Sequence, residues 1–185
     1  MSPDALRELM QREMSRVARA LRKRNALDGK VVHATHKALK RARAALRLLR
    51  DAAGKSFYIR ENAQLRDAAR PLGRLRDTQA LREKLDGLLK GEENAECRSV
   101  LMKLRRELNG GWRKLHEEAQ RAGTLKKSAL MIEEVTGRMR RQRLRVSEPS
   151  FVQTGIARIY RKGRVALADT VARFRSGSLV LDRPT

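Results

Sequence analysis

The segment from His33 to Arg50 reads HATHKALKRARAALRLLR, and its side chains sort by face when the segment is placed on a helix at about 100° per residue. Between Asp28 and Asp51 the chain has seven Lys/Arg, two His and no acidic residue. The basic positions that share an arc of roughly 140° are His33, His36, Lys37, Lys40, Arg43, Arg47 and Arg50. The positions on the opposite side are Ala38, Ala42, Ala45, Leu46 and Leu49. The pattern predicts a helix with one face on a core and a row of cations on the other.

Helical spacing of apolar residues continues along the rest of the chain, with almost no alternating stretch. It predicts helices over about 3–24, 30–53, 58–91, 93–122 and 125–145, and a last helix that holds residues 156–174. We expect Pro71 and Gly73 to interrupt the third helix, with a kink at Pro71, because proline cannot donate a backbone hydrogen bond. Gly110-Gly111 predicts a bend, and residues 147–149 (Ser-Glu-Pro) predict a break.

This order of elements predicts an all-α protein. Four long helices with short connections favour an antiparallel four-helix bundle over residues 1–122. Residues 123–176 then predict additional long helices of an incomplete second bundle, and residues 177–185 a non-helical tail.

The charge of the chain indicates an anionic partner. The 185 residues include 44 Lys+Arg and 21 Asp+Glu, for a formal net charge of +23. Self-repulsion at such a charge destabilises a compact chain unless a polyanion offsets it. Nucleic acid, an anionic membrane surface and another phosphate polymer remain open, as does an arginine-rich surface with no ligand. Aromatic residues make up only 3%, which disfavours binding by base stacking.

The sequence is less informative about the cellular compartment of the protein and about any chemistry it performs. Cys97 is the only cysteine, so no internal disulfide forms, as is typical of a reducing compartment. No apolar run approaches membrane-spanning length, and residues 1–14 lack the apolar core of a signal peptide. We therefore expect a cytoplasmic protein without a membrane partner. No motif indicates catalysis or a cofactor, so we expect a binding protein and not an enzyme.

The two histidines of the basic helix allow three interpretations. His33 and His36 are three residues apart, a spacing that lets two imidazoles share a metal. The neighbouring Lys37, Lys40 and Arg43 would repel a metal ion, so we expect no metal site. Two surface histidines without a ligand are a second interpretation. The third, which we favour, is that both imidazoles donate hydrogen bonds to phosphate oxygens, whose charge would raise their pKa.

Two further basic sets accompany this helix. The second set, which surrounds Pro71 and precedes Asp77, is Arg66, Arg70, Arg74 and Arg76, and we expect Asp77 either to hold Arg74 in an ion pair or to orient a neighbouring arginine. Arg161, Lys162 and Arg164 follow Tyr160. Exposed helices with local ion pairs would explain either set equally well, whereas arginine forks at phosphate oxygens would make them binding sites.

The segment VVHATHKALKRARAALRLLR, together with the later LRDAARPLGRLRDTQALREKL, resembles the CHAD family, the conserved-histidine α-helical domains. The matching residues are Val32-His33, Lys37, Lys40, Arg43, Leu72-Gly73 and Arg76-Asp77. The segment IARIYRKGRVAL, from Ile156 to Leu167, is similar to the helix that opens the second half of the family's fold.

The resemblance implies two related helical bundles around a basic groove that binds inorganic polyphosphate, and a place at polyphosphate granules. We therefore expect a non-catalytic polyphosphate-binding module whose contacts come from the His33–Arg50 helix. Supporting contacts are expected from Arg70, Arg74, Arg76, Arg161, Lys162 and Arg164. The alternative is a nucleic-acid-binding or architectural protein that contacts phosphates alone.

The chain departs from the family pattern in two places. His36 stands where many members have arginine, which keeps a donor but makes its charge depend on pH. Residues 176–185 read SGSLVLDRPT where the family would supply a second His-and-basic helix. Either this is a truncated form or the second bundle is completed otherwise, and our hypothesis is that two chains associate as a homodimer, each offering its helices after Gly123 to the other.

Overall fold

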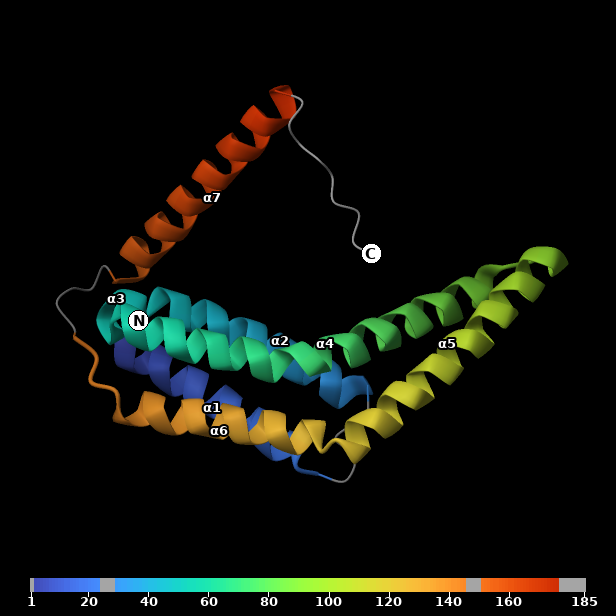
Figure 1. The fold of residues 1–185 in the computed structure, drawn as a ribbon, viewed down its shortest axis with the longest axis horizontal. Helices are drawn as coiled ribbons and strands as arrows, with labels where there is room; N and C mark the ends of the chain where they lie inside the picture. The colour runs from blue at the N-terminus through green and yellow to red at the C-terminus, as the bar shows by residue number, and fades with distance from the viewer. Residues whose placement is uncertain (1, 24–28, 146–150, 177–185) are drawn as a thin grey trace.

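The computed structural model describes residues 2–23, 29–145 and 151–176, which form seven helices and no strand (Figure 1). The helices are α1 (Pro3–Leu21), α2 (Gly29–Leu48), α3 (Arg50–Ala53), α4 (Lys55–Gly91), α5 (Ala95–Arg121), α6 (Thr124–Arg141) and α7 (Phe151–Arg175). The all-α prediction is confirmed. The break expected at residues 147–149 and the tail expected at 177–185 lie outside the described residues.

Caps and glycines set several helix ends. The Ser2 side chain accepts a hydrogen bond from the Ala5 N–H at 3.1 Å, and Asn94 accepts one from the Cys97 N–H at 3.0 Å. Gly54 has φ 93° and Gly123 has φ 60°, values that an L side chain rarely adopts. These two glycines let the chain reverse before α4 and before α6.

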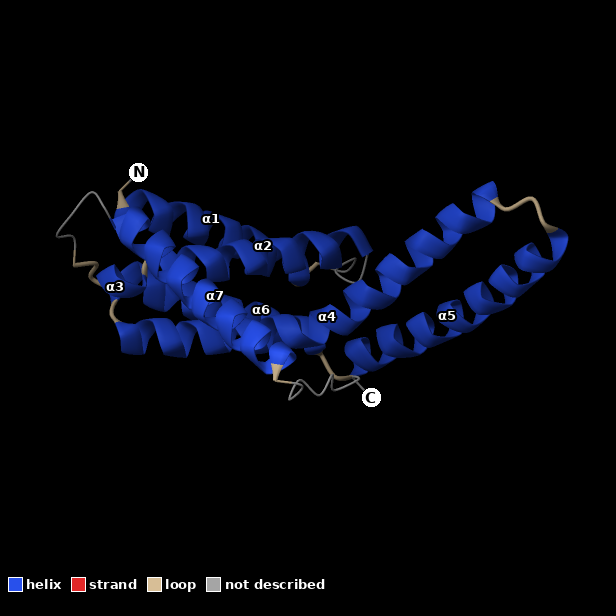
Figure 2. Ribbon diagram, turned by 90° about the horizontal axis from the view of Figure 1, so that it is seen from above, coloured by secondary structure: helices blue, strands red, loops and turns tan. Residues whose placement is uncertain are grey.

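Four helices form the bundle. α1 packs on α2 and α6, and α4 packs on α2 and α6, so each helix has two neighbours in the ring (Figures 1 and 2). Neighbouring helices run antiparallel, as predicted. The apolar positions expected from spacing in α1 and α6 are all buried: Leu6, Met10, Met14, Val17 and Leu21, and Leu125, Ala129, Ile132, Val135 and Met139.

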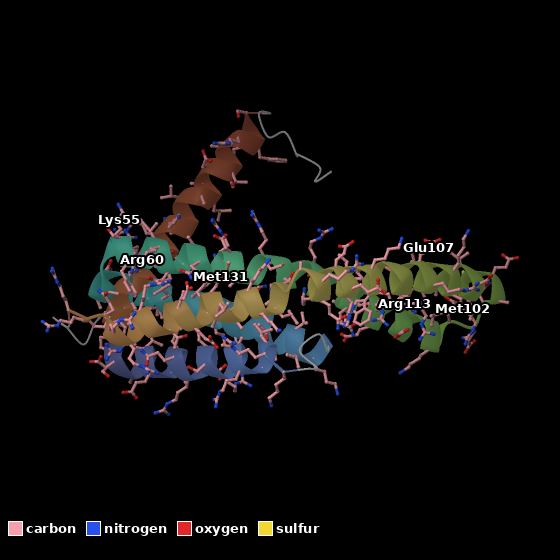
Figure 3. The ribbon with its side chains drawn as sticks, turned by 60° about the horizontal axis from the view of Figure 1, so that its bottom comes forward. Lys55, Arg60, Met102, Glu107, Arg113 and Met131 are labelled. Carbon is pink, nitrogen blue, oxygen red and sulfur yellow. The ribbon has the colours of Figure 1, made fainter. Side chains whose placement is uncertain are left out.

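The fourth place in the bundle belongs to α6 and not to the segment 93–122. α5 packs mainly on the distal half of α4, and this hairpin extends away from the bundle (Figures 1 and 2). The expected division at residues 122 and 123 therefore runs through the packing unit. We call residues 82–121 the arm. In Figure 3, Met102, Glu107 and Arg113 lie on the arm, far from Lys55 and Arg60 on the bundle.

The predicted interruption of the third helix is wrong, because α4 runs from Lys55 to Gly91 without a break, through both Pro71 and Gly73. A bend is nevertheless visible within α4, where it leaves the bundle (Figure 1). Proline removes one backbone donor, but the packing of α4 on α2 and α6 keeps the segment helical. α5 likewise continues through Gly110 and Gly111.

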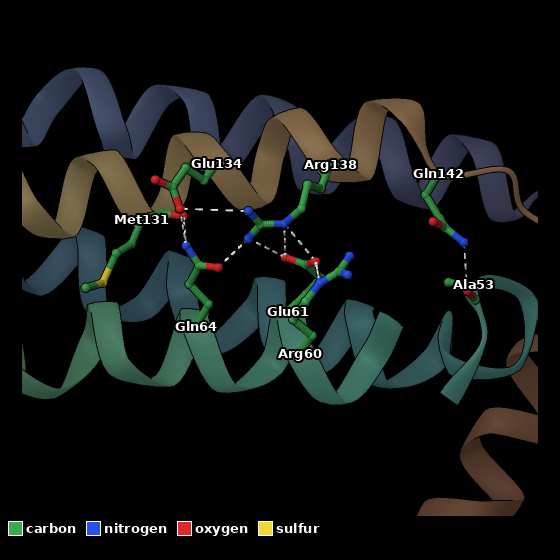
Figure 4. A network of polar contacts seen from close by, with 8 residues as sticks. All are labelled: Ala53, Arg60, Glu61, Gln64, Met131, Glu134, Arg138 and Gln142. Carbon is green, nitrogen blue, oxygen red and sulfur yellow. Dashed lines mark hydrogen bonds and ion pairs between the residues drawn. The ribbon is translucent and has the colours of Figure 1, made fainter. Parts of the chain in front are cut away.

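A polar network ties α4 to α6 inside the bundle (Figure 4). The carboxylate of Glu61 is fully buried and accepts hydrogen bonds from the Arg138 guanidinium at 2.9–3.0 Å. Gln64 also contacts Arg138 and donates to Glu134 at 2.6 Å. The hydrogen bond to Glu61 raises the pKa of Arg138 above its ordinary value, so this guanidinium stays charged.

Candidate anion-binding face

The cations of α2 lie on its solvent side, as the spacing predicted. Ala38, Ala42, Leu46 and Leu49 are buried in the core, and Ala45 packs against it. His33, Lys37, Lys40 and Arg47 are exposed, while His36, Arg43 and Arg50 are half-buried. Burial of the apolar side fixes the rotation of the helix, so the cationic side faces solvent along its length.

A second basic strip lies beside this one on α4. The Arg43 Nε donates to the Asn62 Oδ1 at 3.0 Å and marks the seam between the two helices. Because the helices run antiparallel, the region of α4 around Arg76 then lies beside His36. Arg70 and Arg74 are exposed and Arg76 is half-buried. We define the basic face as His33, His36, Lys37, Lys40, Arg43 and Arg47 of α2 with Arg70, Arg74 and Arg76 of α4.

Most cations of this face have no carboxylate partner. Among the described residues, no Asp or Glu forms an ion pair with Lys37, Lys40, Arg47, Arg70 or Arg74. In contrast, Arg66 pairs with Asp67 at 3.4 Å and Arg76 with Asp77 at 2.9 Å. Asp77 therefore orients Arg76, its neighbour in sequence. Five exposed cations on two adjacent helices are left for an external anion.

The pKa of His36 is sensitive to the cations that surround it. Partial burial lowers its pKa first, and the positive charges of Lys40, Arg76 and His33 lower it further, while Asp77 opposes them. Its Nδ1 is buried and has no hydrogen-bond partner in the structure. Charges from both helices therefore act on one imidazole, which shows that the two strips meet.

Two arginines near the carboxyl end of α2, Arg50 and Arg158, make different contacts. The Arg50 guanidinium lies 6.0 Å from the centre of the Tyr58 ring, and its Nε is buried without a partner. Arg158 of α7, which the sequence did not single out, donates to the backbone carbonyl of Arg47 at 2.7 Å and pairs with Asp51. Arg158 thus anchors α7 at the carboxyl end of α2, where a cation is favoured.

The three candidates on α7 are all exposed, but they point in different directions. At about 100° per residue, Lys162 lies within about 40° of Arg158 and so on the side that meets the bundle. Arg164 is turned about 120° from Arg158. α7 also extends away from the bundle beyond its first turns (Figure 1). Of this set, Lys162 has the rotation that suits a contribution to the basic face.

No signal in the sequence identified Asn62 or Arg158. Both act through partners distant in the chain, Asn62 on Arg43 and Arg158 on Asp51. Among the described residues, no group of three or more His, Cys, Asp or Glu side chains is placed to hold a metal ion. Within that same part of the chain, none of the helices combines the length and hydrophobicity needed to cross a membrane.

The arrangement suits a chain of anions rather than a single one. The row from His36 to Arg50 covers roughly 20 Å at about 1.5 Å per residue. Guanidinium forks bind phosphate oxygens in pairs, and lysines add point charges between them.

Comparison with protein families, unlike comparison with individual proteins, gives a match for this chain. Neither the curated proteins nor the solved structures contain a match to this sequence. A comparison with protein families matches the CHAD domain over residues 5–177, a range that takes in α2 to α7 and all of α1 but its first two residues. Because this match covers nearly the whole chain, the protein belongs to the CHAD family.

Proposed function

We propose that the protein binds inorganic polyphosphate through the basic face and gathers at polyphosphate granules by that contact. CHAD domains are in general associated with polyphosphate binding. The observation that carries the proposal here is the set of five exposed cations without a carboxylate partner: Lys37, Lys40, Arg47, Arg70 and Arg74. Each can bind a phosphate oxygen without first breaking an internal ion pair.

Rigid placement of these cations favours a polymer. Their helices are held by buried apolar sides, so the charges keep their spacing when the ligand is absent. Because the helices are already formed, binding orders only the long side chains and costs little backbone conformational entropy. A flexible polyphosphate chain can adjust to that row and release many condensed counterions.

Nucleic acid is the second candidate, because a face of arginines and lysines also binds a phosphodiester backbone. Its phosphates are spaced more widely, and in a duplex they are fixed in position. The test is a titration with long-chain polyphosphate at near-physiological salt, with duplex DNA at equal phosphate concentration as competitor. Tight binding that DNA does not displace supports the proposal. Displacement by DNA would make the face a general anion surface.

A pair of variants tests the location of the site. Replacing Lys37, Lys40 and Arg43 together with alanine removes three cations from the face and should weaken polyphosphate binding by at least about tenfold. The matched control replaces Lys84, Lys103 and Arg113, three exposed cations of the arm, with alanine. Both variants lose the same net charge. Equal loss in both would mean that total charge, and not this face, determines affinity.

The proposed role is binding without a catalytic step. Incubation of the protein with polyphosphate, with and without divalent cations, should leave the length of the polymer unchanged. Shortened chains would contradict this part of the proposal.

A further inference from the structure

α7 carries an apolar stripe that no other described part of the chain covers. At helical spacing, Ile156, Tyr160, Leu167, Val171 and Phe174 lie on one side of the helix. Their exposed fractions are 55%, 67%, 64%, 39% and 75%. In the bundle, by contrast, the core-facing apolar positions of α1 and α6, such as Met14 and Ile132, are buried. A contiguous exposed stripe of this size marks an interaction surface.

The stripe faces away from the protein's own bundle. α7 meets the bundle through its first turns, where Gly155 lies so close to Leu48 that an added Cβ would be 3.1 Å from a Leu48 side-chain carbon. Arg158 contacts α2 and Asp51 on that same side. The stripe residues are turned about 100–160° from Gly155. The side of α7 that meets the bundle therefore leaves the stripe exposed.

The pattern of the stripe complements itself. If two such helices pack antiparallel with Leu167 opposite Leu167, positions equally far before and after it share a level. Tyr160 then lies level with Phe174 of the other copy, seven residues away on either side. Gly163 lies level with Val171, which places the smallest residue beside a branched one. Such an interface is isologous, as in most homodimers.

The area offered is enough for a modest dimer. An aromatic side chain buries roughly 150–250 Å² when fully covered, and an aliphatic one less. In this register Ile156 lies beyond the end of the other copy's α7, and the remaining four side chains at these exposures offer on the order of 500 Å² per helix, so two helices bury roughly 1,000 Å². This is the lower bound for a specific interface. The sequence predicted a dimer in which each chain offers all of its helices after Gly123. In the structure α6 already packs in its own bundle, so α7 is the helix left for such a contact.

The geometry points to a second copy of this chain as the partner of α7, with two α7 helices packed antiparallel about Leu167. Repulsion between two chains of net charge +23 opposes this contact. Salt screens that repulsion and strengthens apolar association. The dimer should therefore tighten as salt rises, the opposite of anion binding by the basic face, so the two proposals fail independently.

Sedimentation velocity of the full chain without polyphosphate tests the inference, over roughly a hundredfold range of concentration at about 0.15 M and 1 M NaCl. We expect a monomer–dimer equilibrium that shifts toward dimer at high salt. Leu167→Arg should weaken it by about tenfold or more, with helicity kept, because arginine is as good a helix former as leucine. A monomer at every concentration and both salts would overturn the inference.

Two further variants fix the interface. Leu88→Arg makes the same change at a leucine of the arm that is 62% exposed, and it should leave the dimer intact. Gly163→Leu should weaken the dimer through crowding with Val171, although a Cβ at Gly163 meets no atom within 4 Å in one chain. If Leu88→Arg abolishes the dimer and Leu167→Arg does not, the contact lies on the arm, and the assignment to α7 is wrong.

Discussion

Glu61 holds a negative charge in the core, next to Arg138 and between α4 and α6. Removing one partner of a buried ion pair leaves the other without compensation, which is more destabilising than the pair was stabilising. We therefore expect the Glu61–Arg138 pair to specify how α4 packs on α6, and so how α4 presents Arg70 and Arg74.

We expect Glu61→Ala to lower the free energy of unfolding by about 3 kcal/mol. The control is Glu8→Ala, which removes an exposed carboxylate paired with Arg12 at 3.6 Å and should cost about 0.5 kcal/mol or less. Urea unfolding followed by circular dichroism measures both. Similar small losses in the two variants would show that the Arg138 charge is solvated after the change.

His36 should make polyphosphate binding depend on pH. Burial and the nearby cations hold its pKa below the ordinary value in the free protein, so near neutral pH the imidazole carries less charge than an ordinary histidine. A bound polyanion raises that pKa, so binding takes up a proton between the two values. Affinity should therefore rise as the pH falls from about 7.5 toward 5.5. Titrations in buffers of different ionisation enthalpy measure the proton uptake.

The same pKa shift has the opposite sign for stability of the free protein. Since the folded state binds this proton less readily than the unfolded chain, stability falls as pH drops through the ordinary histidine range. His36→Gln should flatten both dependences, whereas His116→Gln, on the arm, should change neither. Affinity that stays constant over this range in the unchanged protein would remove the imidazole from the list of contacts.

At the scale of the element, periodicity predicts which side of a helix is buried but not which neighbour buries it. Met14 and Ile132 follow helical spacing and are buried as expected. Leu104 of α5 also follows that spacing but is 45% exposed, because α5 packs chiefly on one helix. The contact of Glu61 with Arg138 spans 77 positions in the chain, and no local sequence pattern predicts it.

The glycine pair of α5 offers a test at this scale. Gly110 and Gly111 lie within a continuous helix, and a Cβ at either position meets no atom within 4 Å. Alanine at both positions should raise helicity and stabilise the arm by about 1 kcal/mol per site. Gly54→Ala is the contrasting change, because φ of 93° strains an L side chain and should destabilise the protein. Thermal unfolding measures all three; destabilisation by the double alanine would show that α5 needs its glycines.

At the scale of the whole molecule, the basic face could be predicted only in part. The α2 row follows from spacing alone, so Lys37 and Lys40 were placed correctly on its exposed side. That Arg76 acts on His36 depends on the antiparallel pairing of α2 with α4 and on its register. Register comes from packing over many residues, and no local pattern contains it.

Salt dependence tests how many cations act together. For five unpaired cations that each neutralise one phosphate, the logarithm of the polyphosphate affinity should fall with the logarithm of salt concentration with a slope of about −4. Alanine at Lys37, Lys40 and Arg43 should reduce the magnitude of that slope by about 2. Isothermal titration at several salt concentrations measures it. A slope near zero would rule out counterion release as the driving force.

The arm gives the molecule a strong electrical asymmetry. Residues 82–121 carry ten Lys/Arg and eight Asp/Glu, so this end is nearly neutral, while the rest of the chain holds almost all of the excess positive charge. Separated along the long axis (Figure 3), the two ends form a large permanent dipole moment. In the field of a polyanionic surface the protein should turn bundle-first before contact. The arm would then project outward from any surface to which the protein adheres.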